Sequence, residues 1–195
     1  EDKVGKFKKS LLGEFLSDDS ALYKKVKLGE ICKLIYGKAL DKKDRVENGI
    51  IPVYGANGIK AFANKSLYDK PSIIIGRKGS ARELNKVLEP FWALDVSYYV
   101  TIDVSIVDLD FLFYTLITLN LPSMARGVKP GINRNDVYDK LINLPPLSKQ
   151  QVIVAKLNEA FSEIENANEA IRKSKINYLA IKSAIIKQEL QSEIV

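Results

Sequence analysis

LPPLSKQQVIVAKL (residues 144–157) divides the sequence into two parts of different character. Its two prolines end the structure that precedes them, and Ser148 with Gln151 three residues later has the spacing of a capping box that opens a helix. Neither proline nor glycine occurs between Ser148 and Val195. The stretch therefore predicts a boundary near Pro146, with a separate domain before it and one long helix after it.

Apolar residues recur along the predicted helix at the heptad spacing of a coiled coil. A helix of about 40 residues is about 60 Å long, which is twice the diameter of about 30 Å expected for the preceding domain. We therefore expect the helix to project and to need another helix on its apolar seam, with a helix folded back on its own domain as the alternative. The predicted interface residues are Ile153, Leu157, Ile164, Ile171, Tyr178, Ile181 and Ile185.

Strand patterns dominate the segment before the boundary, residues 26–146. Two short apolar runs, 50–53 and 59–62, flank an Asn57-Gly58 pair, which predicts a tight hairpin turn with two residues at positive φ. The isoleucines at 73–75 predict a fully buried strand. Apolar and polar residues alternate over 96–102, which predicts a half-buried strand.

Two shorter helices are predicted as well. Asp108 is an N-cap residue type, and one helical face before Pro122 carries Leu109, Leu112, Phe113, Leu116 and Ile117. Residues 6–16 form a second amphipathic pattern, which SDDS (17–20) ends. The sequence thus predicts a short helix and linker (1–25), an α+β (mixed α/β) domain with a small twisted mixed sheet (26–146), and a long projecting helix of the coiled-coil type (147–195).

Composition narrows the classes of function. The chain has no histidine and one cysteine, Cys32, which removes the usual Ser-His-Asp, Cys-His and zinc chemistry and favours a binding protein. The net charge of +6 favours an anionic partner, although a merely soluble basic protein would show it too. No apolar run is long enough to span a bilayer, the N-terminus lacks a signal-peptide core, and the lone cysteine fits a cytoplasmic location.

Three glycine-containing loops carry the cations that could reach a phosphate backbone. GRKG follows the buried strand, ARGVKPGINRN (125–135) contains no carboxylate, and a third loop follows Tyr36. Each could instead be an ordinary solvated surface, and the hairpin turn alone would explain Asn57. The candidate DNA-binding residues are Tyr36, Lys38, Lys42, Lys43, Tyr54, Asn57, Lys60, Arg77, Lys78, Ser80, Arg126, Lys129, Asn133 and Arg134.

Two other classes stay open on these residues. One is a magnesium-dependent nuclease that uses carboxylates such as Glu83 and Asp95, although neither has an acidic neighbour at a recurring short spacing. The other is a coiled-coil scaffold without nucleic-acid function. A further weak signal is that KKSLLGEFLS (8–17) resembles KSAIIKQELQ (182–191), which hints at a head-to-tail or two-fold arrangement.

Taken together and in order, several segments resemble one half of the specificity (S) subunit of a type I restriction–modification enzyme. The matching segments are VKLGEIC (26–32), YGK (36–38), IPVYGANG (51–58), IIIGRKGS (73–80), FWALDVSYYV (91–100), DFLFYTL (110–116), GVKPGINRNDV (127–137) and LPPLSKQQVIVAKL (144–157). The resemblance implies a non-catalytic target recognition domain that reads one half of a split site in double-stranded DNA. It also implies a spacer helix on which modification subunits dock.

The same resemblance implies partners and cofactors. S-adenosylmethionine would belong to the modification subunits, ATP and magnesium to the restriction subunits, and no cofactor or metal to this chain. Arg77 and Lys78 would be held toward phosphates, while neighbouring loops read bases. Because one recognition domain is present, the chain is either a half-subunit that pairs with itself as a homodimer or a fragment of a two-domain subunit.

Overall fold

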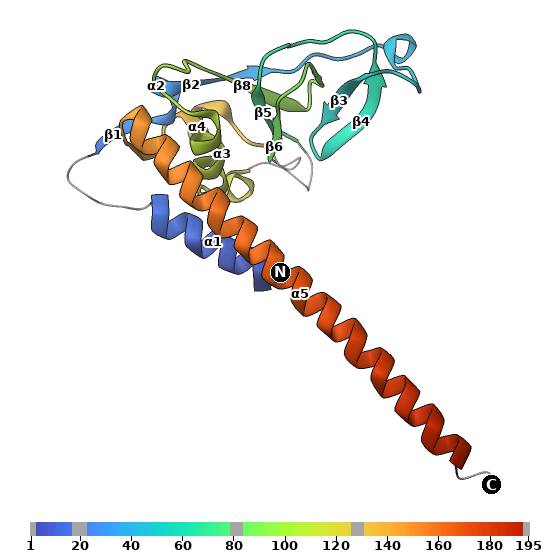
Figure 1. The fold of residues 1–195 in the computed structure, drawn as a ribbon. Coiled ribbons are helices and arrows are strands. Elements are labelled where there is room, and N and C mark those ends of the chain that lie inside the picture. The colour runs from blue at the N-terminus through green and yellow to red at the C-terminus, as the bar shows by residue number, and fades with distance from the viewer. Residues whose placement is uncertain (1–2, 17–22, 79–83, 126–130, 193–195) are drawn as a thin grey trace.

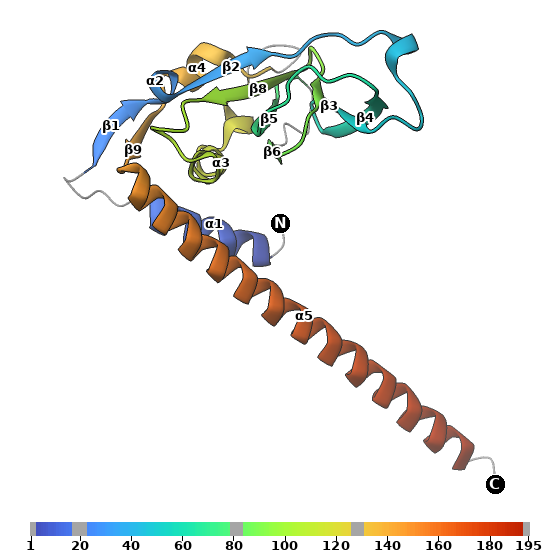
Figure 2. The same ribbon diagram turned by 45° about the horizontal axis from the view of Figure 1, so that its top comes forward.

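The computed structural model describes residues 3–16, 23–78, 84–125 and 131–192. A domain of small sheets and short helices lies at one end, and the C-terminal helix α5 projects from it (Figures 1 and 2). The elements in order are α1 (Lys3–Leu16), β1 (Lys24–Lys27), α2 (Leu28–Ile31), β2 (Cys32–Tyr36), the 3-10 helix η1 (Lys42–Asp44), β3 (Ile51–Gly55), β4 (Gly58–Ala63), β5 (Ser72–Gly76), β6 (Leu84–Val87), β7 (Trp92–Ala93), β8 (Ser97–Ile102), α3 (Leu109–Thr118), the 3-10 helix η2 (Leu121–Met124), α4 (Arg134–Tyr138), β9 (Leu141–Leu144) and α5 (Leu147–Ser192).

In the part of the chain that the structure describes, the strands form three small sheets instead of one. A four-stranded sheet has the order β2-β8-β5-β6 and is antiparallel throughout. A three-stranded sheet has the order β4-β3-β7, with β3 and β7 parallel, and β1 pairs with β9. The predicted α+β class with mixed pairing and a long final helix is confirmed, and among the described strands the parallel pairing is confined to the β3–β7 contact.

β5 is buried along its whole length, as its run of isoleucines predicted. Ile73 and Ile75 pack with Leu112 and Leu116 of α3 in the main core, while Ile74 faces a second cluster that contains Phe91. Apolar cover on both faces is the reason that this strand shows no polar alternation. Its exit is therefore a rigid point in the domain.

α3 joins the sheet to the long helix. It begins where predicted, with the Asp108 carboxylate accepting hydrogen bonds from the backbone N–H groups of Asp110 and Phe111 at 2.9 Å each. One face of α3 packs on the four-stranded sheet, and Phe111 on another face packs with Leu12 of α1 and Leu157 of α5. The base of α5 is thus part of the domain core.

Two local predictions differ from the structure: the geometry of the hairpin turn and the residue that begins the long helix. Gly58 (φ 85°) is the only residue of the β3–β4 hairpin turn at positive φ, so Asn57 does not supply the second one. A register shift follows between Val53 and Tyr54, which is how a hairpin combines an ordinary turn with a bulge. The long helix begins at Leu147, so Ser148 lies inside its first turn and is not the N-cap of a capping box.

Gln150 instead fixes the start of α5. Its side chain is fully buried, and its amide oxygen accepts a hydrogen bond from the Asp108 backbone N–H at 2.9 Å. Its amide nitrogen donates to the carbonyl oxygens of Ile106 (3.0 Å) and Pro145 (2.8 Å). One side chain therefore ties the start of α3 to the start of α5.

Replacing Gln150 with alanine should lower the free energy of unfolding by about 2 to 3 kcal/mol, because one buried and two partly buried backbone groups lose their partner. Chemical unfolding followed by circular dichroism measures this change. The matched control is Gln151→Ala, an exposed position on the same helix, which should stay within about 0.5 kcal/mol of the parent. Equal stability of the two variants would contradict the role of Gln150.

The predicted apolar seam of α5 is divided between the domain and solvent. Ile153 and Leu157 are buried against α1 and α3 of the same chain, so these two residues are not available as an intermolecular interface. Ile164 is half-buried, and from Ile171 onward the seam is exposed. The expected projection is confirmed for this outer part, and the alternative of a helix folded on its own domain describes the base.

Candidate nucleic-acid interface

The exit of β5 lies against the tip of the β3–β4 hairpin. A Cβ atom added to Gly76 would lie 2.0 Å from the carbonyl oxygen of Ala56, so a larger residue would displace the hairpin. Gly37, directly after β2, is similarly placed, because a Cβ there would lie 2.1 Å from the carbonyl oxygen of Leu94. Gly37 also donates its N–H to the Ser97 carbonyl oxygen at 3.0 Å, and Ser97 pairs with Gly76 in the sheet. The ends of β2, β5 and the hairpin therefore lie together, although the sequence presented them as separate candidates.

The backbone at Arg77 and Lys78 is fixed on both sides. The Arg77 N–H donates to the Val96 carbonyl at 2.9 Å, and the Arg77 carbonyl accepts from the Ile132 N–H at 3.0 Å. Lys78 and Gly131 form an isolated antiparallel bridge. The two basic loops that the sequence singled out therefore meet at this bridge, while their predicted site residues Ser80, Arg126 and Lys129 lie outside the described residues.

The guanidinium group of Arg77 turns back onto the domain. It donates to the Asp95 carbonyl oxygen at 3.0 Å and lies 5.1 Å from the centre of the Tyr36 ring and 5.9 Å from that of Tyr98. Its Nε atom is buried and has no hydrogen-bond partner among the described residues. Arg77 is thus half-buried, whereas the side chain of Lys78 is exposed.

Arg134 approaches the same tyrosine from α4. Its guanidinium lies 5.2 Å from the Tyr36 ring centre and 5.8 Å from that of Tyr138, and it donates to the Leu34 carbonyl oxygen at 3.4 Å. Asn133 serves as the N-cap of α4, with its side-chain oxygen accepting from the Asn135 N–H at 2.9 Å. A local structural role therefore explains Asn133.

Tyr98 supports this cluster from within the core. Its ring centre lies 4.9 Å from that of Tyr36, and its hydroxyl donates to the Ile132 carbonyl oxygen at 3.1 Å. Burial, and after it a hydrogen bond with Tyr36, raises the pKa of Tyr98 to about 12. The Tyr98 hydroxyl is therefore neutral at physiological pH and acts as a fixed hydrogen-bonding group.

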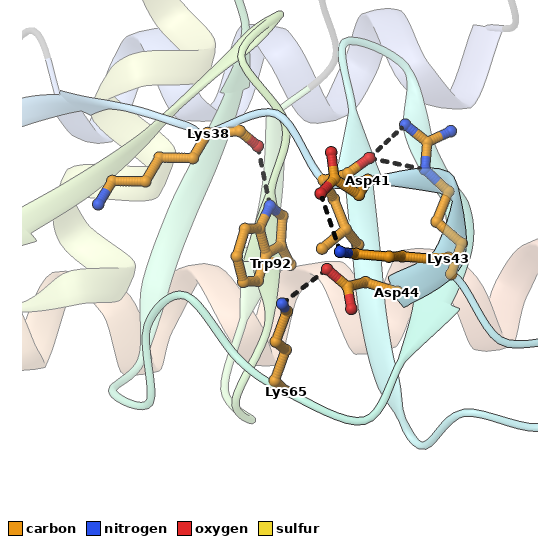
Figure 3. A network of polar contacts seen from close by, with 8 residues as sticks. Lys38, Asp41, Lys43, Asp44, Lys65 and Trp92 are labelled. Carbon is orange, nitrogen blue, oxygen red and sulfur yellow. Dashed lines mark hydrogen bonds and ion pairs between the residues drawn. The ribbon is translucent and has the colours of Figure 1, made fainter.

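The loop after β2 is braced by Trp92 of β7 and by Lys65, which follows β4 (Figure 3). The Trp92 indole N–H donates to the Lys38 carbonyl oxygen at 2.8 Å. Lys65 lies 5.5 Å from the centre of the Trp92 ring and pairs with Asp44 at 2.7 Å, which lowers the pKa of the Asp44 carboxyl. This network ties both ends of the loop, at Lys38 and at Asp44, to the residues around Trp92.

The predicted cations of this loop are exposed. The side chains of Lys38, Lys42 and Lys43 lie in solvent, and Lys43 is 3.9 Å from the Asp41 carboxylate. Acidic residues of the same loop reduce its net positive charge. One of them, Asp44, already pairs with Lys65. The loop thus offers lysines that can turn toward an anionic partner.

The hairpin candidates have unequal positions. Tyr54 packs edge-on against Phe91 at a ring-centre distance of 6.3 Å, within a cluster that also holds Tyr68 and Tyr99, so it is largely a packing residue. Asn57 is exposed at the tip. Lys60 is exposed as well, and its stem runs beside Gly55.

Sequence reasoning missed Trp92, Lys65 and Tyr138, all of which support the site. Two signals could have marked Trp92: it is the single tryptophan of the chain, and it lies in FWALDVSYYV (91–100), one of the segments that carry the family resemblance. Tyr138 accepts a hydrogen bond from the Leu34 N–H at 2.8 Å. Because the two residues are far apart in the sequence, no local pattern predicts this contact.

The structure also bears on the other chemistries. Cys32 is buried, and burial raises the pKa of its thiol to about 12, so the thiolate needed for nucleophilic attack is not formed near neutral pH. In the described ranges, no three acidic or cysteine side chains gather as metal ligands would. Glu83 lies outside those ranges. Within them, no helix has the length and apolarity to cross a membrane.

Known proteins resemble this chain over most of its length. The family model described as "Type I restriction modification DNA specificity domain" matches residues 21–178. The EcoprrI specificity subunit of Escherichia coli is 24% identical over 77% of this chain and 38% of its own length, and the EcoDI specificity subunit of the same organism is 26% identical over 74% and 32%. The chain therefore spans about a third of the length of these relatives.

A solved structure shares the fold. The HsdS subunit from Thermoanaerobacter tengcongensis superposes with a TM-score of 0.67 at 18% identity, covering 86% of this chain and 45% of the HsdS chain. The α+β domain and the helix that follows it are thus a known architecture.

Proposed function

Because this chain belongs to the family of type I restriction modification DNA specificity domains, we propose that it is a DNA-recognition unit of a type I restriction–modification complex. It binds double-stranded DNA and reads one half of a bipartite target. The observation that carries this proposal is the gathering of cationic and aromatic side chains at the ends of β2 and β5 and the start of α4. Within the described part of the chain, Lys38, Lys78, Arg77 and Arg134 have no carboxylate partner.

The exposed lysines are the residues suited to phosphate contacts. Lys78 extends from a backbone that is hydrogen-bonded on both sides, and Lys38, Lys42 and Lys43 extend from the braced loop. Such contacts fix position on the duplex without reading sequence. Asn57 and Lys60 on the hairpin could meet base edges. Ser80, Arg126 and Lys129 lie outside the described residues and stay predicted DNA contacts.

The outer half of α5 is suited to assembly. Its exposed large apolar side chains fall into two stripes at helical spacing, of which the sequence predicted only the first. The first contains Ile171, Tyr178, Ile181 and Ile185, and the second contains Ile176, Leu179 and Ile186. A solvated helix rarely exposes so many apolar groups in rows. Two stripes allow α5 to pair with a second copy of this chain and with modification subunits together.

The catalytic steps belong to the partners in this proposal. Modification subunits would bind S-adenosylmethionine and transfer the methyl group, and restriction subunits would use ATP and magnesium for cleavage. This chain would recognise the DNA target and provide the docking helix, without a catalytic residue or cofactor of its own. Its place of action would be the cytoplasm, where the genome lies.

Replacing Lys78 with alanine should weaken binding to a random-sequence duplex and reduce the slope of log affinity against log salt by about 0.9, the value for one lost phosphate contact. Fluorescence anisotropy at several salt concentrations measures both quantities. Lys70→Ala is the matched control, because Lys70 is an exposed lysine just before β5, at the end away from Gly76. An unchanged slope for Lys78→Ala would remove Lys78 from the interface.

The exposed stripes of α5 also fit a coiled-coil scaffold without nucleic-acid function. The same titration separates the two functions. A scaffold would show no salt-sensitive change in anisotropy with duplex DNA at any concentration at which the chain is folded.

A further inference from the structure

We propose that Tyr36 is an aromatic contact to a DNA base, and that Arg77 and Arg134 are positioning residues that act through its ring and not through phosphates. This inference rests on the proposed function. It assigns the two arginines a role that the basic character of their loops would not suggest.

Tyr36 is held by three elements that are far apart in the sequence. It ends β2, Arg77 leaves β5, and Arg134 begins α4. Both guanidinium groups lie within about 6 Å of one ring centre, which is the range of a cation–π contact. The core residue Tyr98 packs on the same ring. The Tyr36 side chain nevertheless stays 45% exposed.

The hydrogen bonds of the two arginines go to backbone carbonyl groups of the same domain. Arg77 donates to the Asp95 carbonyl, and Arg134 donates to the Leu34 carbonyl. The Nε atom of each is buried without a partner in the described part of the chain. An unpartnered buried donor costs free energy, so this arrangement is poor for stability alone and suits a ring that must be held in one orientation.

A fixed ring gains specificity from its rigidity. A tyrosine that is already in its binding orientation loses little side-chain entropy when it meets a base. Lysine could not replace arginine here, because the planar guanidinium both packs on the ring and reaches the carbonyl. The arginines therefore affect sequence reading, whereas Lys78 affects attraction to the backbone.

A double-mutant cycle tests this assignment. The variants are Tyr36→Ala, Arg77→Lys and the double variant, each titrated by anisotropy against a random-sequence duplex and against a duplex enriched by selection with the parent chain. Tyr36→Ala should weaken binding to the selected duplex by roughly 10-fold or more, the loss of one base contact. Arg77→Lys should give a similar loss with an unchanged salt slope, and the double variant should lose no more than Tyr36→Ala.

Two further variants show whether a loss of binding comes from the Tyr36 ring or from misfolding of the domain. Arg134→Lys probes the same ring from α4 and should repeat the result of Arg77→Lys, while Tyr36→Phe keeps the ring and should bind within about 3-fold of the parent. Additive losses, or a slope that falls by about 0.9 when arginine becomes alanine, would mean that the arginines contact DNA themselves and would overturn the inference. A parent chain that binds neither duplex would instead overturn the proposed function.

Discussion

Replacing Ile171 and Ile181 with aspartate should weaken self-association of the chain by at least about 100-fold. Both side chains are exposed on the first stripe of α5, at 66% and 61%, and lie beyond the part of the helix that packs on the domain. In a helix pair each would enter the seam, where an unpaired carboxylate costs several kcal/mol. Sedimentation equilibrium should then report the monomer mass.

The control for this variant has the same added charge. Asn166→Asp with Asn177→Asp also introduces two carboxylates, but by helical spacing both positions lie on the side of α5 away from the two stripes. Circular dichroism should show the domain folded in both proteins. If the Ile171 and Ile181 variant keeps the mass of the parent dimer, the first stripe is not the pairing surface.

A homodimer of this chain should direct methylation to an interrupted palindrome. Two copies that pair α5 antiparallel about a two-fold axis place identical recognition domains at opposite ends of the helix pair. Identical domains related in this way read identical half-sites in opposite orientation. The gap between half-sites should be several base pairs, because the helices are long compared with the rise of 3.4 Å per base pair.

Co-expression with modification subunits, followed by sequencing of methylated sites, measures this target. The Ile171 and Ile181 variant serves as the control and should abolish methylation. A non-palindromic split target, obtained with this chain as the sole specificity component, would rule out the symmetric dimer and support a fragment of a two-domain subunit.

Local pattern predicted much of the fold. The isoleucine run of β5, the alternation in β8 and the Asp108 cap of α3 are all visible as patterns within a few residues of sequence. The projecting helix was predictable because its length exceeds any surface that the domain could offer. Such features depend on chain geometry and hydrophobic period, which a single sequence displays.

Tertiary packing determined where α5 begins and which of its apolar residues are buried, and neither could be predicted from local pattern. Ser148 has the right spacing for a capping box, but Gln150 reaches across to Asp108 and the helix starts earlier. Ile153 and Leu157 continue the heptad, yet α1 and α3 cover them. The spacing of apolar residues in a sequence shows which face of a helix is apolar, but it does not show which element of the fold covers that face.

The candidate site shows the same division. The sequence identified Arg77 and Lys78 as adjacent cations, and only the structure separates a guanidinium stacked on Tyr36 from an exposed ammonium. Trp92 gave no positional signal for its contact with the Lys38 carbonyl. Side-chain direction depends on neighbours that are distant in the sequence.

Selection of binding sites from a randomised duplex library tests most directly whether this chain reads DNA sequence. The folded chain is incubated with the library, bound duplexes are recovered and sequenced, and the cycle is repeated. The expected result is enrichment of one short motif, which is weakened when Tyr36 is replaced by alanine and retained when Lys70 is replaced by alanine. A recovered pool that stays as random as the input, although anisotropy shows binding, would contradict it.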